Sequence, residues 1–113
     1  MLLLDDSRVA GLAVCHCGAG TEAGPDTCFV KFGAVRPGRS AAEQFERLLD
    51  ACEQLTAARG LSRLVAGANM ARHHAYRSLL ARGFRTWLQG VAMEKPNEPG
   101  YNRPDVYLID DWR

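Results

Sequence analysis

The chain contains 113 residues, which is enough for one small domain with a single hydrophobic core. Hydrophobic residues make up 47% of it and charged residues 24%, proportions typical of a globular protein that folds in water. The net charge of +1 gives no general attraction to polyanions or to anionic surfaces, so we expect neither a nucleic acid nor a membrane as a partner.

Two apolar runs at the start of the chain, residues 2–4 and 8–17, flank the polar residues 5–7 and predict an antiparallel hairpin. Because two aspartates follow the first run at once, we expect neither a signal peptide nor a membrane span there. After a glycine-rich loop, the mostly apolar residues 28–35 predict a strand in the middle of the sheet. Gly33 within this strand indicates a β-bulge or the close approach of another backbone.

Residues 40–59 predict the first helix. Ser40 and Glu43 have the spacing of a capping box, in which the serine hydroxyl accepts a hydrogen bond from a free amide and the glutamate reaches back to the cap residue. Gly60 follows the last periodic residue and can end the helix in a left-handed conformation. The side chains expected to face the core are Phe45, Leu48, Leu49, Cys52 and Leu55.

A short strand over residues 62–66 precedes a second helix, which Asn69 can cap and Gly83 can end. At about 100° per residue, Arg72 and Tyr76 fall on the inward arc of this helix. An inward arginine needs an anionic partner, because burying an unpaired charge is costly. The same arc holds Asn69, Ala71, Ala75, Leu79, Leu80 and Gly83, whereas His73, His74, Arg77 and Ala81 face water.

The rest of the chain predicts two further strands. Residues 85–93 alternate in the manner of a strand, and residues 106–109 form a short apolar run. Residues 95–100, which are polar and contain two prolines, separate them. The expected order is therefore β-β-β-α-β-α-β-β, an α/β (α+β) fold with two helices.

The four cysteines raise the question of metal or redox chemistry. Cys15 and Cys17 alternate along one strand, so they share one of its faces while His16 takes the other. No second pair stands at the spacing of a zinc site, so we expect no bound metal. Buried free thiols in a reducing compartment account for all four, and we expect a cytoplasmic protein. The alternative is a metal module built on residues 15–17, which predicts stoichiometric zinc.

The segment from Leu64 to Phe84 resembles the last strand–helix unit of the GNAT superfamily, the acetyl-CoA-dependent N-acetyltransferases. The family pattern has an asparagine at the strand end, a tyrosine seven residues later, and then leucine, three residues, glycine and phenylalanine. The matching residues here are Asn69, Tyr76, Leu79 or Leu80, Gly83 and Phe84. The resemblance covers nearly the whole chain and implies a mixed, mainly antiparallel sheet in a single domain, residues 1–113.

Members of the family usually begin with a strand and two helices that precede the first hairpin seen here. Those helices form one wall of the acceptor site, so a chain without them is expected to have an open sheet face that a partner covers. We therefore expect a homodimer or association with another chain. The alternative is that the sequence is a fragment of a longer protein.

The resemblance implies direct transfer of an acetyl group from acetyl-CoA to a small-molecule or peptide amine. Tyr76 is then the general acid that protonates the leaving thiolate, since phenols are protonated at neutral pH. A core tyrosine on an inward helix face is the purely structural interpretation. No general base stands out among Glu22, Asp26, Glu94 and His16.

The resemblance also assigns cofactor contacts. Asn69 is expected to bind the cofactor arm, and Arg72 to meet a phosphate or an acidic neighbour in the sheet. The backbone of the central strand is expected to hold the pantetheine, although a plain core strand predicts the same sequence. The strand residues concerned are Gly33, Ala34 and Val35.

The family's phosphate-binding glycines are missing, because their positions at the start of the first helix fall on Glu43 and Phe45. In one interpretation the phosphate loop is rebuilt one turn earlier, where the dipole and free amides of a helix start favour an anion. In the other, the site is degenerate and the chain is a non-catalytic GNAT-like dimerisation or binding module. Two arginines and a glycine favour the rebuilt loop, which consists of Arg36, Gly38, Arg39 and Ser40.

Overall fold

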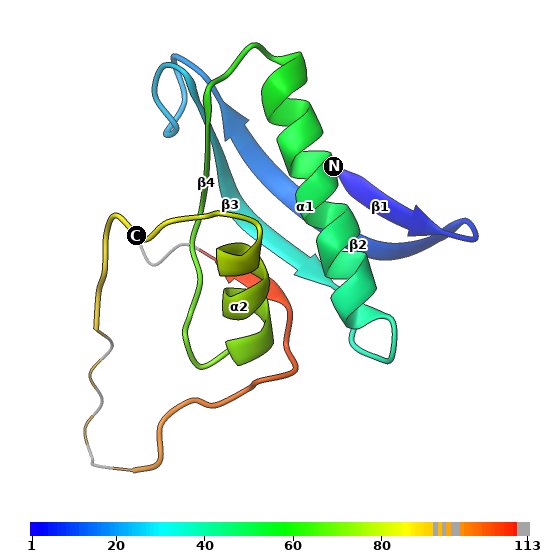
Figure 1. Ribbon diagram of the computed structural model, residues 1–113, viewed down its shortest axis with the longest axis vertical. Helices are drawn as coiled ribbons and strands as arrows, with labels where there is room; N and C mark the ends of the chain where they lie inside the picture. The colour runs from blue at the N-terminus through cyan, green and yellow to red at the C-terminus, as the bar shows by residue number, and fades with distance from the viewer. Residues whose placement is uncertain (92, 94, 96–97, 111–113) are drawn as a thin grey trace.

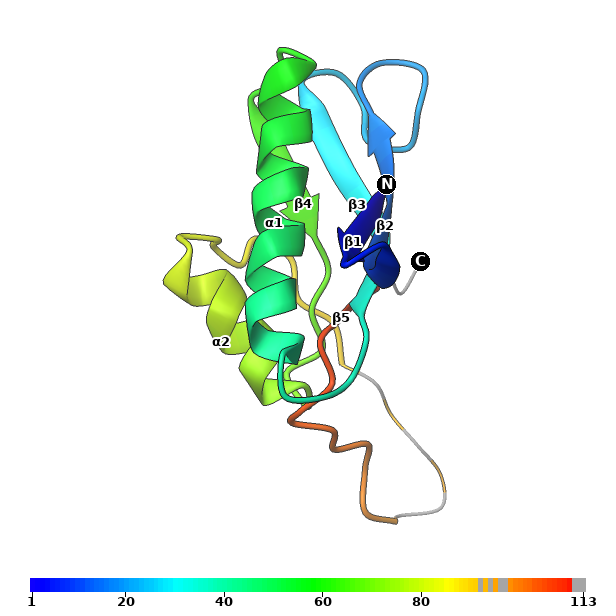
Figure 2. The ribbon, with the colours of Figure 1, turned by 90° about the vertical axis from the view of Figure 1, so that its right-hand side faces the viewer.

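Five strands form one mixed sheet, and two helices pack on one face of it (Figure 1, Figure 2). The computed structural model describes residues 1–91, 93, 95 and 98–110. Over these residues, no helix is long and apolar enough to cross a membrane. The elements in chain order are β1 (Leu2–Asp5), β2 (Arg8–Cys17), β3 (Thr27–Val35), α1 (Ala41–Ala58), β4 (Arg63–Ala66), α2 (His73–Ala81) and β5 (Leu108–Asp110).

Strand β3 is the centre of the sheet. On one edge it pairs with β2, which pairs in turn with β1, and both pairings are antiparallel. On the other edge it has two partners in succession: β4 runs parallel to residues 27–30, and β5 runs antiparallel to residues 32–34. The expected mixed, mainly antiparallel sheet with two helices is therefore confirmed.

The β1–β2 hairpin confirms the prediction from the two apolar runs. Asp6 and Ser7 adopt positive φ values of 47° and 66°, as in the tight turn whose twist matches that of the flanking strands. A β-bulge lies in β3, where the register with β2 leaves Lys31 as an extra residue. The bulge is thus two positions before Gly33, and Gly33 itself lies opposite Ile109 of β5.

Helix α1 packs its apolar stripe on the sheet as predicted. Leu55 at its far end is half-buried, and Gly60, with φ 68°, ends the helix. The fully buried members of the stripe are Phe45, Leu48, Leu49 and Cys52.

The predicted capping box at the start of α1 does not form. The Ser40 side chain makes no cap hydrogen bond, because its backbone (φ −90°, ψ 3°) is outside the extended region that N-cap residues adopt. The Ala41 amide donates to the carbonyl of Gly38. Among the described residues, the amides of Ala42 and Glu43 find no acceptor.

Helix α2 begins at His73, later than the predicted start at Asn69. The Asn69 side chain accepts a hydrogen bond from the Ala71 amide, and its carbonyl accepts one from the Arg72 amide, so residues 69–72 form a turn of their own. The predicted end is confirmed, because Gly83 has φ 99°.

Most of the predicted inward and outward positions of α2 are confirmed. Ala75 and Leu79 are buried, and the four residues expected to face water are all exposed. The prediction for Leu80 is wrong, because its side chain was expected to point inward and is 44% exposed. The reason is that α2 is short and buries only a narrow stripe against the sheet and α1.

The predicted strand over residues 85–93 is wrong for the part of it that the structure describes. Residues 85–91 and 93 have no regular structure, and Ala92 lies outside the described residues. Neither face of the expected strand packs on a surface, because the large apolar side chains of both faces are exposed. These are Trp87, Leu88, Val91 and Met93.

The last predicted strand is confirmed but shifted. It was expected over residues 106–109 and consists of Leu108–Asp110. Over the described residues the order is therefore β-β-β-α-β-α-β, which has one strand fewer than predicted.

In the part of the chain that the structure describes, the helices leave one face of the sheet uncovered. Leu3 and Ala13 point into the core beneath the helices, so Leu2 and Val14 lie on the opposite face. Leu2 and Val14 are 63% and 48% exposed, and Phe32, which pairs with Val14, is 38% exposed. Figure 2 shows α1 and α2 on one side of the sheet, and these exposed apolar side chains lie on the other side.

Candidate functional site

The residues expected to bind a cofactor occupy three segments: the end of β3, the loop before α1, and the turn before α2. Helices α1 and α2 start at the same end of the molecule (Figure 1). The fold therefore directs the positive ends of both helix dipoles towards one region.

In the loop before α1, the two arginines differ in what they contact. The guanidinium of Arg36 donates to the carbonyl of Val9 from Nε and Nη2, at 3.2 and 3.0 Å, so it is held against β2. Arg39 is exposed and forms no ion pair with a described residue. Gly38 has φ 140°, a conformation that favours glycine. Arg39 is therefore the cation of this loop that remains available to an anion.

The end of β3 is already paired on both edges. Gly33 and Ala34 lie opposite residues 109 and 108 of β5. The Val35 amide donates to the carbonyl of Tyr107 at 3.2 Å. Strand β5 and the residue before it thus occupy the backbone edge that was expected to accept a pantetheine.

Arg72 is buried, as its place on the inward arc predicts, with 8% of its surface exposed. Its guanidinium donates two hydrogen bonds to the Asp110 carboxylate, at 2.9 and 3.1 Å, and one from Nε to the Tyr101 hydroxyl at 3.0 Å. Burial by itself lowers the pKa of Arg72, but the hydrogen bonds to Asp110 and Tyr101 outweigh it, and the net shift is upward. The expected acidic neighbour in the sheet is therefore Asp110.

Tyr107 was not singled out from the sequence, yet it lies between the starts of the two helices. Its ring centroid is 5.2 Å from that of Phe45 on α1 and 6.3 Å from that of His74 on α2. Burial raises the pKa of Tyr107, and the carboxylates of Asp105 and Glu46 raise it further. The short apolar run of residues 106–109 predicted a strand here but gave no signal for where the strand would pair.

Tyr76, the expected general acid, is half-buried on α2, and its amide donates to the carbonyl of Arg72 at 3.1 Å. Within the described part of the chain its hydroxyl makes no hydrogen bond, which leaves the phenol available to a ligand. Of the residues considered as general base, Glu22 pairs with Lys31 at 3.0 Å. His16 packs edge-on against a phenylalanine ring, and Glu94 lies outside the described residues.

The cysteines are all free thiols, as expected, but only Cys28 and Cys52 are buried, whereas Cys15 and Cys17, on β2, are partly exposed. Cys15 contributes to the core, whereas His16 lies on the other face of β2 against Phe29, so the predicted division of faces is confirmed. In the residues that the structure describes, no group of three or more cysteine, histidine or acidic side chains is placed to hold a metal ion.

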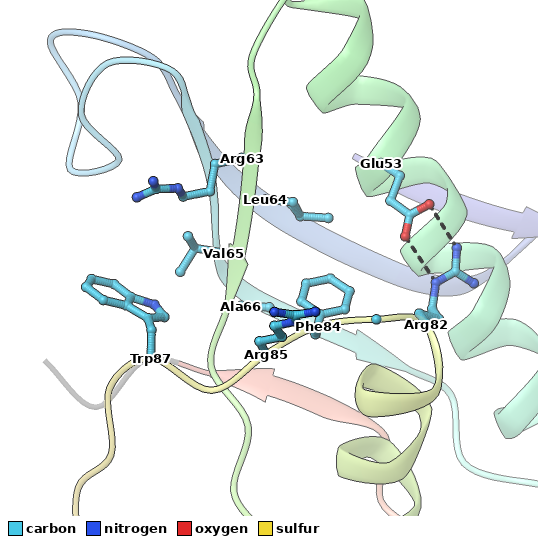
Figure 3. Close-up of a pocket in the computed structure, with 10 residues that line it drawn as sticks. Glu53, Arg63, Leu64, Val65, Ala66, Arg82, Phe84, Arg85 and Trp87 are labelled. Carbon is cyan, nitrogen blue, oxygen red and sulfur yellow. Dashed lines mark hydrogen bonds and ion pairs between the residues drawn. The ribbon is translucent and has the colours of Figure 1, made fainter.

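A cavity of about 590 Å³ lies beside β4, at the far end of α2 (Figure 3). Arg82 borders it and forms ion pairs with three carboxylates of α1, which raise the pKa of Arg82 above its usual range. None of the residues expected to bind a cofactor lines this cavity. Its lining consists of Glu53, Arg63, Leu64, Val65, Ala66, Arg82, Gly83, Phe84, Arg85 and Trp87.

Comparison with models of protein families, with curated proteins and with solved structures finds no match to the chain. The resemblance to the GNAT superfamily therefore rests on the strand–helix unit of the sequence.

Proposed function

We propose that the chain is a GNAT-like domain that binds acetyl-CoA and transfers its acetyl group to an amine acceptor. The observation that carries this proposal is the open start of α1. Because Ser40 does not cap the helix, the amides of Ala42 and Glu43 have no acceptor among the described residues, and Arg39, which precedes Ser40, has no acidic partner among them. Unpaired amides, the helix dipole and a nearby cation together favour the phosphates of the cofactor.

In this proposal the acceptor amine attacks the thioester carbonyl of acetyl-CoA, so that a C–N bond forms and the C–S bond breaks. Tyr76 gives its proton to the leaving thiolate, a role that contributes about 10²–10⁴-fold in comparable enzymes. The amine nitrogen loses a proton to water as the amide forms, and water returns a proton to Tyr76. The rest of the rate enhancement comes from holding the two reactants in the correct orientation. The Val35 amide can polarise the carbonyl only after it exchanges its present bond to Tyr107.

A second candidate, a non-catalytic GNAT-like dimerisation or binding module, is favoured by a different observation. Strand β5 pairs with the backbone of Gly33 and Ala34, and Asp110 already engages the charge of Arg72. These residues then serve only the stability of the fold. In that case the open apolar face of the sheet is the functional surface, and a second copy of the chain is the partner proposed for it.

Titration of the purified chain with acetyl-CoA, followed by calorimetry, separates the two candidates. We expect micromolar binding that weakens about tenfold in Arg39→Ala, because a hydrogen bond to a charged phosphate is lost. Arg59→Ala is the matched control, since Arg59 is an exposed arginine at the opposite end of α1. A chain that fails to bind at millimolar cofactor is not an acetyltransferase, and the binding module then becomes the conclusion.

A further inference from the structure

The four cysteines gather in one part of the fold, although they come from β2, β3 and α1. The Cys17 and Cys28 thiols are in contact, and Cys52 and Cys28 are near enough to Cys15 to shift the pKa of its thiol, with Cys52 raising it. Neither the proposed acetyl transfer nor the proposed binding surface uses any of them. Their grouping therefore calls for its own explanation.

Cys17 and Cys28 have the geometry that precedes a cross-strand disulfide. They lie directly opposite each other in the β2–β3 pairing, and their Sγ atoms are 3.6 Å apart. The Gly18 amide donates to the Thr27 carbonyl at 2.9 Å, so Cys17 and Cys28 are a non-hydrogen-bonded pair of the antiparallel ladder. The Cα atoms of such pairs are about 4.5 Å apart, which lies within the range that a disulfide spans.

The two thiols differ in their access to solvent. Cys17 is partly exposed, whereas Cys28 is completely buried. Burial raises the pKa of Cys28 to about 12, which keeps it protonated at neutral pH. An oxidant therefore reaches Cys17 first, and Cys28 stands behind it as the resolving thiol.

We propose that Cys17 and Cys28 are a redox-active dithiol that closes to a disulfide when a small-molecule disulfide, such as glutathione disulfide, is present. The Cys17 thiolate attacks one sulfur of the oxidant, breaks its S–S bond and releases one thiol. The Cys28 sulfur, on losing its proton, attacks Sγ of Cys17 in the mixed disulfide and releases the second thiol. The protein loses two electrons and two protons, and the two halves of the oxidant gain them.

The cross-link fastens the ends of β2 and β3 across the loop of residues 18–26. Hydrogen bonds within that loop, and from the amides of residues 62 and 63 to the Asp26 carbonyl, hold it in place, and its three glycines and Asp26 adopt positive φ values. Closure requires the sulfur atoms to approach from 3.6 Å to bonding distance, about 2.05 Å, which rotation of the Cys17 side chain and a small movement of the strand end supply. Oxidation thus closes this loop into a covalent ring.

The test is equilibration of the full chain in glutathione buffers that run from fully reducing to fully oxidising, followed by trapping of the remaining thiols with N-ethylmaleimide. We expect the number of trapped thiols to fall from four to two, with no glutathione retained in the intact mass. Cleavage after Glu22 separates Cys17 from Cys28 in sequence. The two fragments are therefore expected to stay joined until the sample is reduced.

Single substitutions of the cysteines identify which two of them form the disulfide. Cys17→Ser is expected to lose the cross-link completely, whereas Cys15→Ala and Cys52→Ala keep it as matched controls. Circular dichroism checks that each variant is folded. The proposal is overturned by four trapped thiols in the most oxidising buffer, by glutathione that remains on Cys17, or by an internal cross-link that survives in Cys17→Ser.

Discussion

A single buried guanidinium, that of Arg72, fastens the last strand of the sheet to the turn before α2. Helical spacing in the sequence predicted that Arg72 points inward and needs an anion. It could not predict that the anion is Asp110, because the two residues are 38 positions apart and a single sequence contains no signal for a pairing over that distance. The same limit applies to Tyr101, whose hydroxyl accepts the remaining hydrogen bond of this guanidinium.

Removal of the Asp110 charge is expected to reveal how much the ion pair between Arg72 and Asp110 contributes to the free energy of unfolding. In Asp110→Asn, Arg72 stays buried but loses its charged partner, which is expected to lower the free energy of unfolding by about 2 kcal/mol, measured by urea denaturation. Asp105→Asn is the control, because the Asp105 side chain is 86% exposed and its contact with His74 contributes little. Equal losses in the two variants would contradict a special role for Asp110.

At the scale of helices and strands, the elements predicted correctly are those with local signals. The polar turn at Asp6 and Ser7 fixes the first hairpin, and Gly60 and Gly83 end their helices with the positive φ that glycine permits. The strand predicted over residues 85–93 fails because alternation alone does not form a strand; an edge must be available to pair and a surface to bury the side chains. The prediction for the start of α1 fails for a different reason. Ser40 and Glu43 have the spacing of a capping box, but the backbone of Ser40 does not adopt the conformation of an N-cap residue.

Arg82, directly after the last residue of α2, links the two helices by ion pairs. Its guanidinium bonds to Glu46 at 2.7 Å, Asp50 at 2.5 Å and Glu53 at 3.2 Å, three carboxylates on one side of α1. All three acids are roughly half exposed, so Arg82→Gln is expected to cost only about 1 kcal/mol, and less in high salt. Arg77→Gln, on the outward side of α2, is the control in the same thermal denaturation series. A loss that does not shrink with added salt would argue against an electrostatic origin.

At the scale of the whole molecule, α1 and α2 cover one face of the sheet and leave the other face open. The sequence predicted an open face through the resemblance to the GNAT superfamily, and the exposed side chains of Leu2, Val14 and Phe32 are found there. It did not predict that β5 would pair with the end of β3, because that placement depends on packing among segments from opposite ends of the chain. For this reason the core around α1 could be predicted, whereas the surroundings of the expected cofactor site could not.

Self-association through the open face is the outcome that we expect in solution. Val14→Lys places a charge in the middle of that face and is expected to convert a dimer into a monomer, measured by sedimentation equilibrium at micromolar concentration. Leu88→Lys is the matched control, since Leu88 is 69% exposed but lies outside the sheet. A wild-type chain that is monomeric under these conditions would rule out this interface.

The division of one edge of β3 between β4 and β5 also bears on how the protein is made. Residues 32–34 are synthesised more than 70 residues before the strand that covers them, residues 108–110. On the ribosome this edge of β3 therefore remains unpaired while the intervening residues are produced. Unpaired strand edges attract other strands, and pairings between distant segments form slowly. The nascent chain thus carries an edge open to intermolecular pairing until residues 108–110 have been made and have paired with it.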